Sequence, residues 1–243
     1  MRKVAFITGA SGDIGSVAAR QLAKDGYAVA LGFNTNESAA NELSAELKSQ
    51  GFEAIAVGCD ITDSGSITSA LSLIKKELGE VALLVNNAGI SKICLFTSNS
   101  CEDITRMINT NLIGCMETAR QVLGDMIRAK SGNIINISSV WGEKGASCEV
   151  AYSAAKAGLI GFTKALAREE APSGIRVNCV SCGYIDTKMN AELEQEEIQA
   201  VLEEIPSGRL GTVQDVANVI SFLASDKSDY INGQVIRVDG CWI

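Results

Sequence analysis

The chain has 243 residues, and its 21 Lys and Arg against 29 Asp and Glu give a formal net charge of -8. This acidic balance argues against binding to nucleic acid or to an anionic membrane surface, because both repel negative charge. The sequence contains no histidine, which excludes Ser-His-Asp and Cys-His catalysis and histidine-based metal sites, so we expect no metal.

Short apolar segments alternate with longer segments of helical periodicity. The predicted strands are nearly continuous apolar runs, as in parallel strands covered on both faces. They are Val4–Ile7, Ala28–Leu31, Ala54–Val57, Ala82–Val85, Ile134–Ile137, Val177–Val180 and Val235–Val238. The predicted helices are Ile14–Lys24, Glu37–Ser49, Ser66–Leu78, Ile104–Arg128, Tyr152–Glu170 and Val213–Ser225.

This alternation predicts an α/β fold with a single Rossmann-type doubly wound parallel seven-stranded sheet and helices on both faces. No linker divides the chain, so residues 1–243 are expected to form a single domain. Asp63 is placed to cap the third helix, and Thr212 with Asp215 matches a capping box before the last one. The acidic segment Ala191–Glu204 predicts an additional amphipathic helix with a solvated charged face.

A glycine-rich loop, Gly9-Ala10-Ser11-Gly12-Asp13-Ile14-Gly15, joins the first predicted strand to a helix. Glycines there allow a tight turn and the close approach of a pyrophosphate to the backbone. The helix N-terminus offers unpaired N–H groups to the phosphates. The loop therefore predicts a dinucleotide site, although turn glycines alone would give the same pattern.

The end of the second strand bears on the choice of cofactor. It carries Asn34, Thr35 and Asn36, and it lacks the acidic residue that binds the ribose 2′-OH of NAD. No Lys or Arg stands there for a 2′-phosphate, but the polar side chains can donate to one. We therefore predict NADP(H) in preference to NAD(H). Asp60, after the third strand, can accept from the adenine amino group or can serve as a cap or turn acid.

A candidate catalytic group surrounds Tyr152 and Lys156, which are spaced i, i+4 and share one helix face. A nearby ammonium lowers the pKa of a phenol, which is near 10 when free. Such a phenol can protonate a carbonyl oxygen during hydride transfer. Ser139, at the end of the fifth strand, can hold the carbonyl. Asn111 lies in a helical segment, where a buried amide predicts a backbone or water contact.

Together these motifs resemble the short-chain dehydrogenase/reductase family over essentially the whole chain. The matching residues are Thr8–Gly15, Cys59-Asp60, Asn86–Gly89, Asn111, Ser139, Tyr152–Lys156 and Asn178. The resemblance implies the strand order 3-2-1-4-5-6-7, a catalytic Asn–Ser–Tyr–Lys set and a homotetramer. It implies that Tyr152 donates the proton and that Lys156 binds the nicotinamide ribose and lowers the Tyr152 pKa. It also implies that Ser139 orients the carbonyl and that Asn111 holds a relay water.

The cofactor contacts implied by the resemblance run along the carboxyl ends of the strands. They are Gly9, Ser11, Asp13, Ile14, Gly15, Asn34, Thr35, Asp60, Ile61, Asn87, Ala88, Gly89, Tyr152, Lys156, Gly183, Ile185 and Thr187. One departure is Cys182, which stands where the family commonly has Pro and which we expect to loosen the loop entry. Cys179 and Cys182 form a lone CxxC, which we interpret as two small residues ending a strand rather than a redox or zinc motif.

For the substrate, the chain looks most like the 3-oxoacyl-acyl-carrier-protein reductases. Locally, Trp141–Val150 and Ala157–Leu166 look like the reductases that act on 5-aminopentanone-modified elongation factor P. An acidic carrier protein docks on basic residues beside the site; Lys130 is available, but Ser173 stands where the fatty-acid enzymes carry Arg. Glu149 should face the substrate mouth, where it suits an amine and repels an anionic carrier, unless it is a solvated loop acid.

The expected substrate is thus a ketone, which the two resemblances would place on elongation factor P or on an acyl carrier protein, with Trp141, Glu149 and Tyr184 as its contacts. A catalytically silent NADP-binding regulatory module is the alternative of another class, but the complete catalytic set argues against it. Eight scattered cysteines and the lack of a long apolar run predict a cytoplasmic protein with reduced thiols. The apolar end, Cys241-Trp242-Ile243, should pack on a partner or on its own core.

Overall fold

The computed structural model describes residues 3–187 and 195–243. Seven parallel strands form one sheet in the order β3-β2-β1-β4-β5-β6-β7, as predicted. The strands are β1 (Val4–Ile7), β2 (Ala28–Phe33), β3 (Ala54–Gly58), β4 (Val81–Asn86), β5 (Gly132–Ser139), β6 (Ile175–Cys182) and β7 (Val235–Val238). The strand order reverses between β1 and β4, which creates the crevice where doubly wound sheets bind their ligands.

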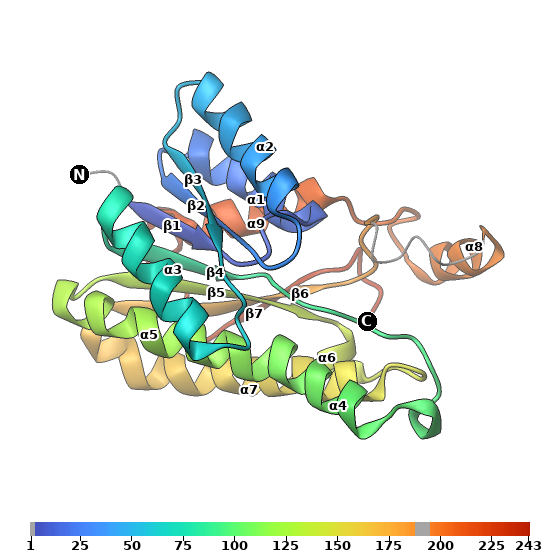
Figure 1. Cartoon of the computed structure of the whole chain (residues 1–243). Coiled ribbons are helices and arrows are strands. Elements are labelled where there is room, and N and C mark those ends of the chain that lie inside the picture. The colour runs from blue at the N-terminus through green and yellow to red at the C-terminus, as the bar shows by residue number, and fades with distance from the viewer. Residues whose placement is uncertain (1–2, 188–194) are drawn as a thin grey trace.

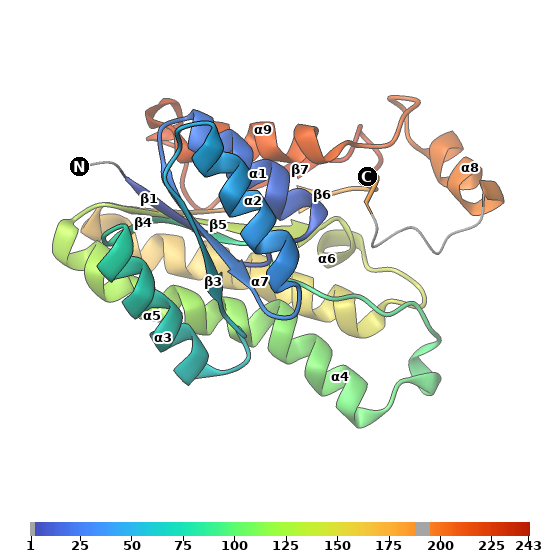
Figure 2. The same cartoon turned by 45° about the horizontal axis from the view of Figure 1, so that its top comes forward.

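Helices cover both faces of the sheet (Figures 1 and 2). One layer contains α1 (Asp13–Lys24), α2 (Glu37–Ser49) and α9 (Val213–Ala224), which pack over a core that includes Ile7 and Val85. The other contains α3 (Ser64–Glu77), α4 (Cys101–Ile108), α5 (Gly114–Ala129) and α7 (Val150–Glu170), over a core that includes Phe6 and Leu84. Alternate residues of each central strand thus enter opposite cores, which explains the continuous apolar strand sequences.

The predicted helix Ile104–Arg128 differs from the structure. The chain there forms α4, a π-helical turn at Asn109–Ile113 and α5, and it begins earlier because Ser100 and Asp103 form a capping box. The predicted caps are confirmed: Asp63 accepts from the Gly65 N–H at 2.8 Å, and Thr212 with Asp215 forms the second capping box.

Two helices lie at the carboxyl edge of the sheet, beside the loops that follow β5 and β6. The short α6 (Trp141–Lys144) was not predicted. The additional acidic helix is confirmed as α8 (Gln195–Glu204), which projects from the body of the protein in Figure 1. The beginning of its predicted range, 191–194, lies outside the described residues. Over the described part of the chain, every helix is too short or too polar to cross a membrane.

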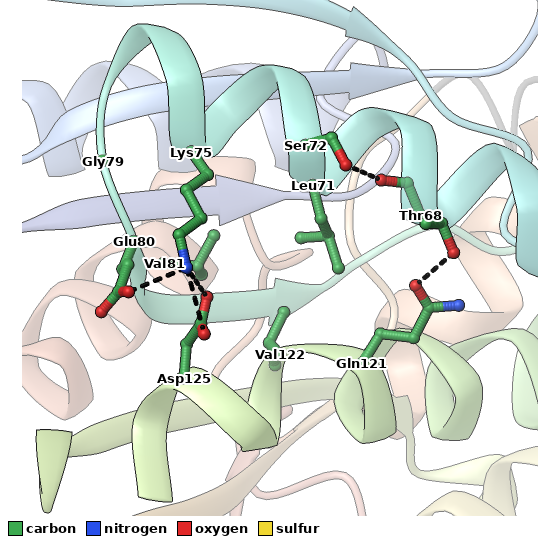
Figure 3. Close-up of a pocket in the computed structure, with 10 residues that line it drawn as sticks. All are labelled: Thr68, Leu71, Ser72, Lys75, Gly79, Glu80, Val81, Gln121, Val122 and Asp125. Carbon is green, nitrogen blue, oxygen red and sulfur yellow. Dashed lines mark hydrogen bonds and ion pairs between the residues drawn. The ribbon is translucent and has the colours of Figure 1, made fainter. Parts of the chain in front are cut away.

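A surface cavity of about 220 Å³ lies between α3 and α5 (Figure 3). Its polar side chains bind one another across the two helices. Lys75 Nζ lies 2.9 Å from Glu80 and 3.1 Å from Asp125, and Thr68 donates to Gln121 at 2.9 Å. These contacts hold the two helices together, which gives this cavity a structural role.

Candidate active site

The glycine-rich loop places the backbone of β1 against the start of α1. Gly9 has a φ of 64°, in the left-handed region that favours glycine. A Cβ on Gly15 would lie 2.5 Å from the Gly9 oxygen and 2.7 Å from the Asn87 amide nitrogen. Among the described residues, no side chain caps α1 at its N-cap, Gly12, so the first N–H groups can face an anion. The loop therefore fits a pyrophosphate.

The end of β4 is tied to this loop by hydrogen bonds in both directions. Thr8 Oγ1 accepts from the N–H groups of Asn87 and Ala88 at 3.0 and 3.1 Å. The Asn87 side chain donates to the carbonyls of Thr8 and Gly9 at 3.0 and 3.1 Å. This network fixes the floor of the crevice between β1 and β4, where the middle of a dinucleotide would lie.

On the adenosine side, the structure places Asn34 and Thr35 on the surface at the end of β2. Asn36 is engaged as the N-cap of α2, where it accepts from the Ala39 N–H at 3.2 Å. Asp60 accepts through Oδ1 from the N–H and the hydroxyl of Thr62 at 2.9 and 2.7 Å, as a turn acid does, and the adenine contact stays a prediction. Ile61 is buried below it. The cap uses only the Asn36 side-chain oxygen, so the side-chain donors of Asn34, Thr35 and Asn36 all stay candidates for a 2′-phosphate.

The candidate catalytic residues meet where β5 ends and α7 begins. Ser139 forms a hydrogen bond with Tyr152, and its Oγ also accepts from the Trp141 N–H at 3.2 Å. Lys156 is buried, donates to the Ile137 carbonyl at 2.8 Å, and lies 5.5 Å from the centre of the Tyr152 ring. The structure thus brings the predicted serine, tyrosine and lysine together.

Asn111 lies in the π-helical turn between α4 and α5. It is fully buried; its side chain donates to the Ile90 carbonyl at 2.9 Å and accepts from the Ile90 N–H at 3.1 Å. The predicted backbone contact is therefore confirmed. The extra residue of a π turn re-aims a side chain, a device common at functional sites. Here it directs the amide at Gly89. A Cβ added to Gly89 would lie 2.7 Å from Asn111 Oδ1 and 3.6 Å from Lys156 Nζ.

The electrostatics differ from our expectation for Tyr152. Burial is the main influence and raises the Tyr152 pKa above its usual value; the charge of Glu149 acts in the same direction. The Lys156 ammonium lies over the Tyr152 ring, and burial lowers the Lys156 pKa. The expected lowering of the Tyr152 pKa is therefore not found in this arrangement. The phenol is held protonated, the form required of a proton donor.

The segment after β6 carries three residues that the sequence predicts to contact the cofactor. The Gly183 N–H donates to the Val238 carbonyl at 2.9 Å, and a Cβ there would lie 2.7 Å from Asp239. Ile185 pairs with Gly211 in an isolated bridge, and Thr187 donates to the Ile185 carbonyl at 3.4 Å. These contacts order the chain as far as Thr187 and place its three predicted cofactor residues at the carboxyl end of β6.

The two cysteines of the CxxC both lie within β6 and are buried. Burial raises the pKa of each thiol to about 12. They are therefore neutral thiols at physiological pH, as in the interpretation we favoured, because a reactive cysteine needs a low pKa and exposure.

The three predicted substrate residues lie on segments that flank the catalytic group: α6, the residue before α7 and the loop after β6. Glu149 immediately precedes α7, and burial raises its pKa, while a hydrogen bond from Trp141 lowers it. It is thus more enclosed than a solvated loop acid. Tyr184 follows β6, and the ring of Trp242, which the sequence did not assign to the site, packs against both Trp141 and Tyr184.

Lys130 is a correction to the sequence analysis. Lys130 is the C-cap of α5 and lies where the strands of the sheet begin. Gly174, the residue after Ser173, packs against its carbonyl. Ser139 lies at the opposite edge, the length of β5 away, or about 25 Å for eight residues. Within one chain, Lys130 therefore does not border the site.

This crevice, with its serine, tyrosine, lysine and asparagine, has the form of a nicotinamide-dependent oxidoreductase site. The short chain dehydrogenase family model matches residues 3–198. The chain therefore belongs to the short-chain dehydrogenase/reductase family, whose members bind a nicotinamide cofactor, and it is an oxidoreductase acting on CH–OH or C=O groups.

Several relatives cover nearly the whole chain. It is 41% identical over 238 residues to the 3-oxoacyl-[acyl-carrier-protein] reductase FabG of Pseudomonas aeruginosa, covering 98% of this chain and 96% of that protein. It is 40% identical to the oxidoreductase YmfI of Bacillus subtilis, over 100% of this chain and 99% of that protein. A crystal structure assigned as a gluconate dehydrogenase of Agrobacterium tumefaciens is 33% identical, with a TM-score of 0.95 over 99% of this chain and 95% of that one.

Proposed function

We propose that the protein is an NADPH-dependent ketone reductase that acts on the 5-aminopentanone group of modified elongation factor P. The observation that carries the substrate is Glu149, a half-buried carboxylate at the mouth of the site whose charge reaches Tyr152. A ketone with an ammonium group would neutralise this carboxylate on binding. An uncharged 3-oxoacyl group on an acidic carrier would not.

The residues have complementary roles in this reduction. A bound nicotinamide supplies the hydride. Tyr152 donates its hydroxyl proton to the carbonyl oxygen, which Ser139 orients through a second hydrogen bond. Lys156, held by the Ile137 carbonyl, presents its ammonium to the ribose, and Asn111 stabilises the segment around Gly89 that borders the cofactor. The described glycine cradle and the uncapped start of α1 fit the pyrophosphate.

The cofactor preference should favour NADPH. The end of β2 offers exposed Asn34 and Thr35 and no carboxylate before Glu37, so it lacks the group that selects the ribose 2′-OH. We expect kcat/KM for NADPH to exceed that for NADH in steady-state assays. A preference for NADH would mean that Asp13 or Glu37 binds the ribose hydroxyls.

Glu149→Gln should discriminate among substrates. Loss of the carboxylate should weaken kcat/KM for an aminoketone by about 1–3 kcal/mol, the worth of a partly desolvated charged hydrogen bond, and leave a neutral ketone of similar size almost unchanged. The same change should not harm an acetoacetyl carrier thioester, because it removes a repulsive charge. Equal effects on all three substrates would show that Glu149 only shapes the loop.

The pH profile gives a second check on Glu149. Its raised pKa means that protonation, and with it the loss of the amine attraction, begins at higher pH than for an exposed glutamate. Relative kcat/KM for the aminoketone over the neutral ketone should therefore fall as the pH falls through this pKa. The Glu149→Gln variant should show a flat ratio over the same range.

A true 3-oxoacyl-acyl-carrier-protein reductase is the second candidate. It is favoured by the full-length similarity to FabG proteins, including 42% identity to that of Escherichia coli. The enclosed carboxylate at the mouth is what distinguishes the two candidates. Turnover of aminopentanone-modified elongation factor P, followed by NADPH oxidation, supports the first; turnover of the carrier thioester alone supports the second.

The reductase is proposed to work as a homotetramer in the cytoplasm. Apolar side chains on the outer surface around α5 support the assembly: Ile113, Met116 and Ile127 are each more than 40% exposed. All eight cysteines are free, which supports a reducing compartment. Sedimentation at micromolar concentration should show a tetramer, and a monomer would refute the assembly. Trp242 packs on its own chain, so the C-terminus no longer requires a partner.

A further inference from the structure

The C-terminal Trp242 joins three separate segments around the mouth of the site. Its ring makes edge-to-face contacts with Trp141, at 4.9 Å between centroids, and with Tyr184, at 6.5 Å. Its indole N–H donates to Glu204 at the end of α8, at 3.1 Å. One residue thus connects α6, the loop after β6 and the projecting acidic helix.

This aromatic group is directly connected to the reaction centre. The Trp141 backbone N–H donates to Ser139 Oγ at 3.2 Å, and Ser139 forms a hydrogen bond with the Tyr152 hydroxyl. The Trp141 side chain also donates to Glu149. The three rings are half-buried, so each retains surface that a ligand can cover. A substrate whose carbonyl meets Tyr152 would extend past these rings and past Glu149.

We propose that Trp242 is a specificity-determining residue, which with Trp141, Tyr184 and Glu149 forms an aromatic site for the ammonium group of the substrate. This inference rests on the proposed aminoketone activity and deepens it. Ring faces attract cations through the aromatic quadrupole, most strongly for Trp, and the attraction grows when the cation is desolvated. Glu149 supplies the counter-charge, and the hydrogen bond to Glu204 fixes the orientation of the Trp242 ring.

The sequence provides a direct probe of this site, because its only two tryptophans are Trp141 and Trp242. Intrinsic tryptophan fluorescence therefore reports on the mouth alone. The full-length enzyme saturated with NADP⁺ is titrated with pentylamine, which carries the cation but has no carbonyl to reduce. Pentanol, which has the same chain length without the charge, is the matched ligand. We expect a saturable change with pentylamine at concentrations at least about 3-fold lower than with pentanol.

Variants separate the ring from its hydrogen bond. Trp242→Ala should weaken pentylamine binding by about 3–30-fold, the range for a cation–π contact, while pentanol binding changes little. Trp242→Phe keeps a ring and should lose less. Tyr230→Ala removes a fully exposed aromatic ring outside this site and should behave as the wild type. Far-UV circular dichroism and sedimentation confirm that each variant is folded and assembled.

Kinetics complete the test. Trp242→Ala should raise KM for an aminoketone with little change in kcat, and leave KM for the neutral ketone unchanged, since a uniform binding contact affects KM alone. Equal fluorescence responses to pentylamine and pentanol, or equal losses for both ketones, would overturn the proposal. Failure of the wild type to reduce any aminoketone would instead refute the proposed function, and the binding titration distinguishes the two cases.

Discussion

Replacing Tyr152 by Phe should reduce kcat by at least ~100-fold, the usual scale of general acid catalysis, with cofactor binding nearly unchanged. The substitution removes the hydroxyl and keeps the ring. Ser139 would lose its hydrogen bond to Tyr152 but keep the one from the Trp141 backbone N–H, and Lys156 would keep its hydrogen bond to the Ile137 carbonyl at 2.8 Å. The proposed ribose contact and the proposed pyrophosphate site would therefore remain. Single-turnover NADPH oxidation, with cofactor affinity measured separately, checks both parts of the expectation.

The matched control is Tyr230→Phe, which removes a hydroxyl from a fully exposed tyrosine. It should retain wild-type activity. If Tyr152→Phe also retains near-normal activity, the proton comes from another group and the proposed catalytic set is wrong. A large loss of cofactor affinity in Tyr152→Phe would instead show that the tyrosine mainly supports the nicotinamide site.

Gly15→Ala should reduce cofactor affinity by about 10-fold or more, which corresponds to roughly 1.4 kcal/mol. The added Cβ would lie 2.5 Å from the Gly9 oxygen and 2.9 Å from Ala10 Cα, and both are backbone atoms of the loop that we propose as the pyrophosphate site. The loop must move to accept it, and overpacking of this kind typically costs about 1–3 kcal/mol. Titration calorimetry with NADPH and thermal unfolding measure the two effects.

Gly161→Ala is the matched control within the same chain. Gly161 lies in the middle of α7, and a Cβ there meets nothing within 4 Å. Alanine is favoured over glycine in a helix interior, so this variant should be as stable as the wild type or more stable, by up to about 1 kcal/mol. If Gly15→Ala binds NADPH as tightly as Gly161→Ala, the loop does not hold the pyrophosphate.

Most of the fold was predictable because local patterns and the global architecture agree. Continuous apolar runs indicated strands buried on both faces, and their alternation with helices restricted the topology to a parallel sheet. The π turn at Asn109–Ile113 was not predictable, because the insertion of one residue into a helix leaves the apolar period nearly unchanged. The buried Asn111 within a helical pattern was its only sequence signal.

The candidate site was predicted in part. Ser139 stands at the end of a predicted strand, and Tyr152 and Lys156 are spaced i, i+4 on one helix face. These two features were sufficient to predict that the three residues lie together. The contact of Trp242 with Trp141 joins residues about a hundred positions apart, and no periodicity encodes such a pairing; the apolar terminus signalled only that it must pack somewhere. The Tyr152 pKa was missed because burial depends on the packed environment, which outweighed the nearby ammonium.

The most direct test of the proposed function is a competition between its two candidate substrates. Equal concentrations of aminopentanone-modified elongation factor P and acetoacetyl carrier thioester are incubated with the enzyme and limiting NADPH, and both products are quantified by mass spectrometry. The product ratio reports the ratio of the two kcat/KM values, which is the measure of specificity. We predict that reduced elongation factor P predominates and that Glu149→Gln shifts the ratio toward the thioester. Predominance of the reduced carrier thioester with the wild type would contradict the assignment.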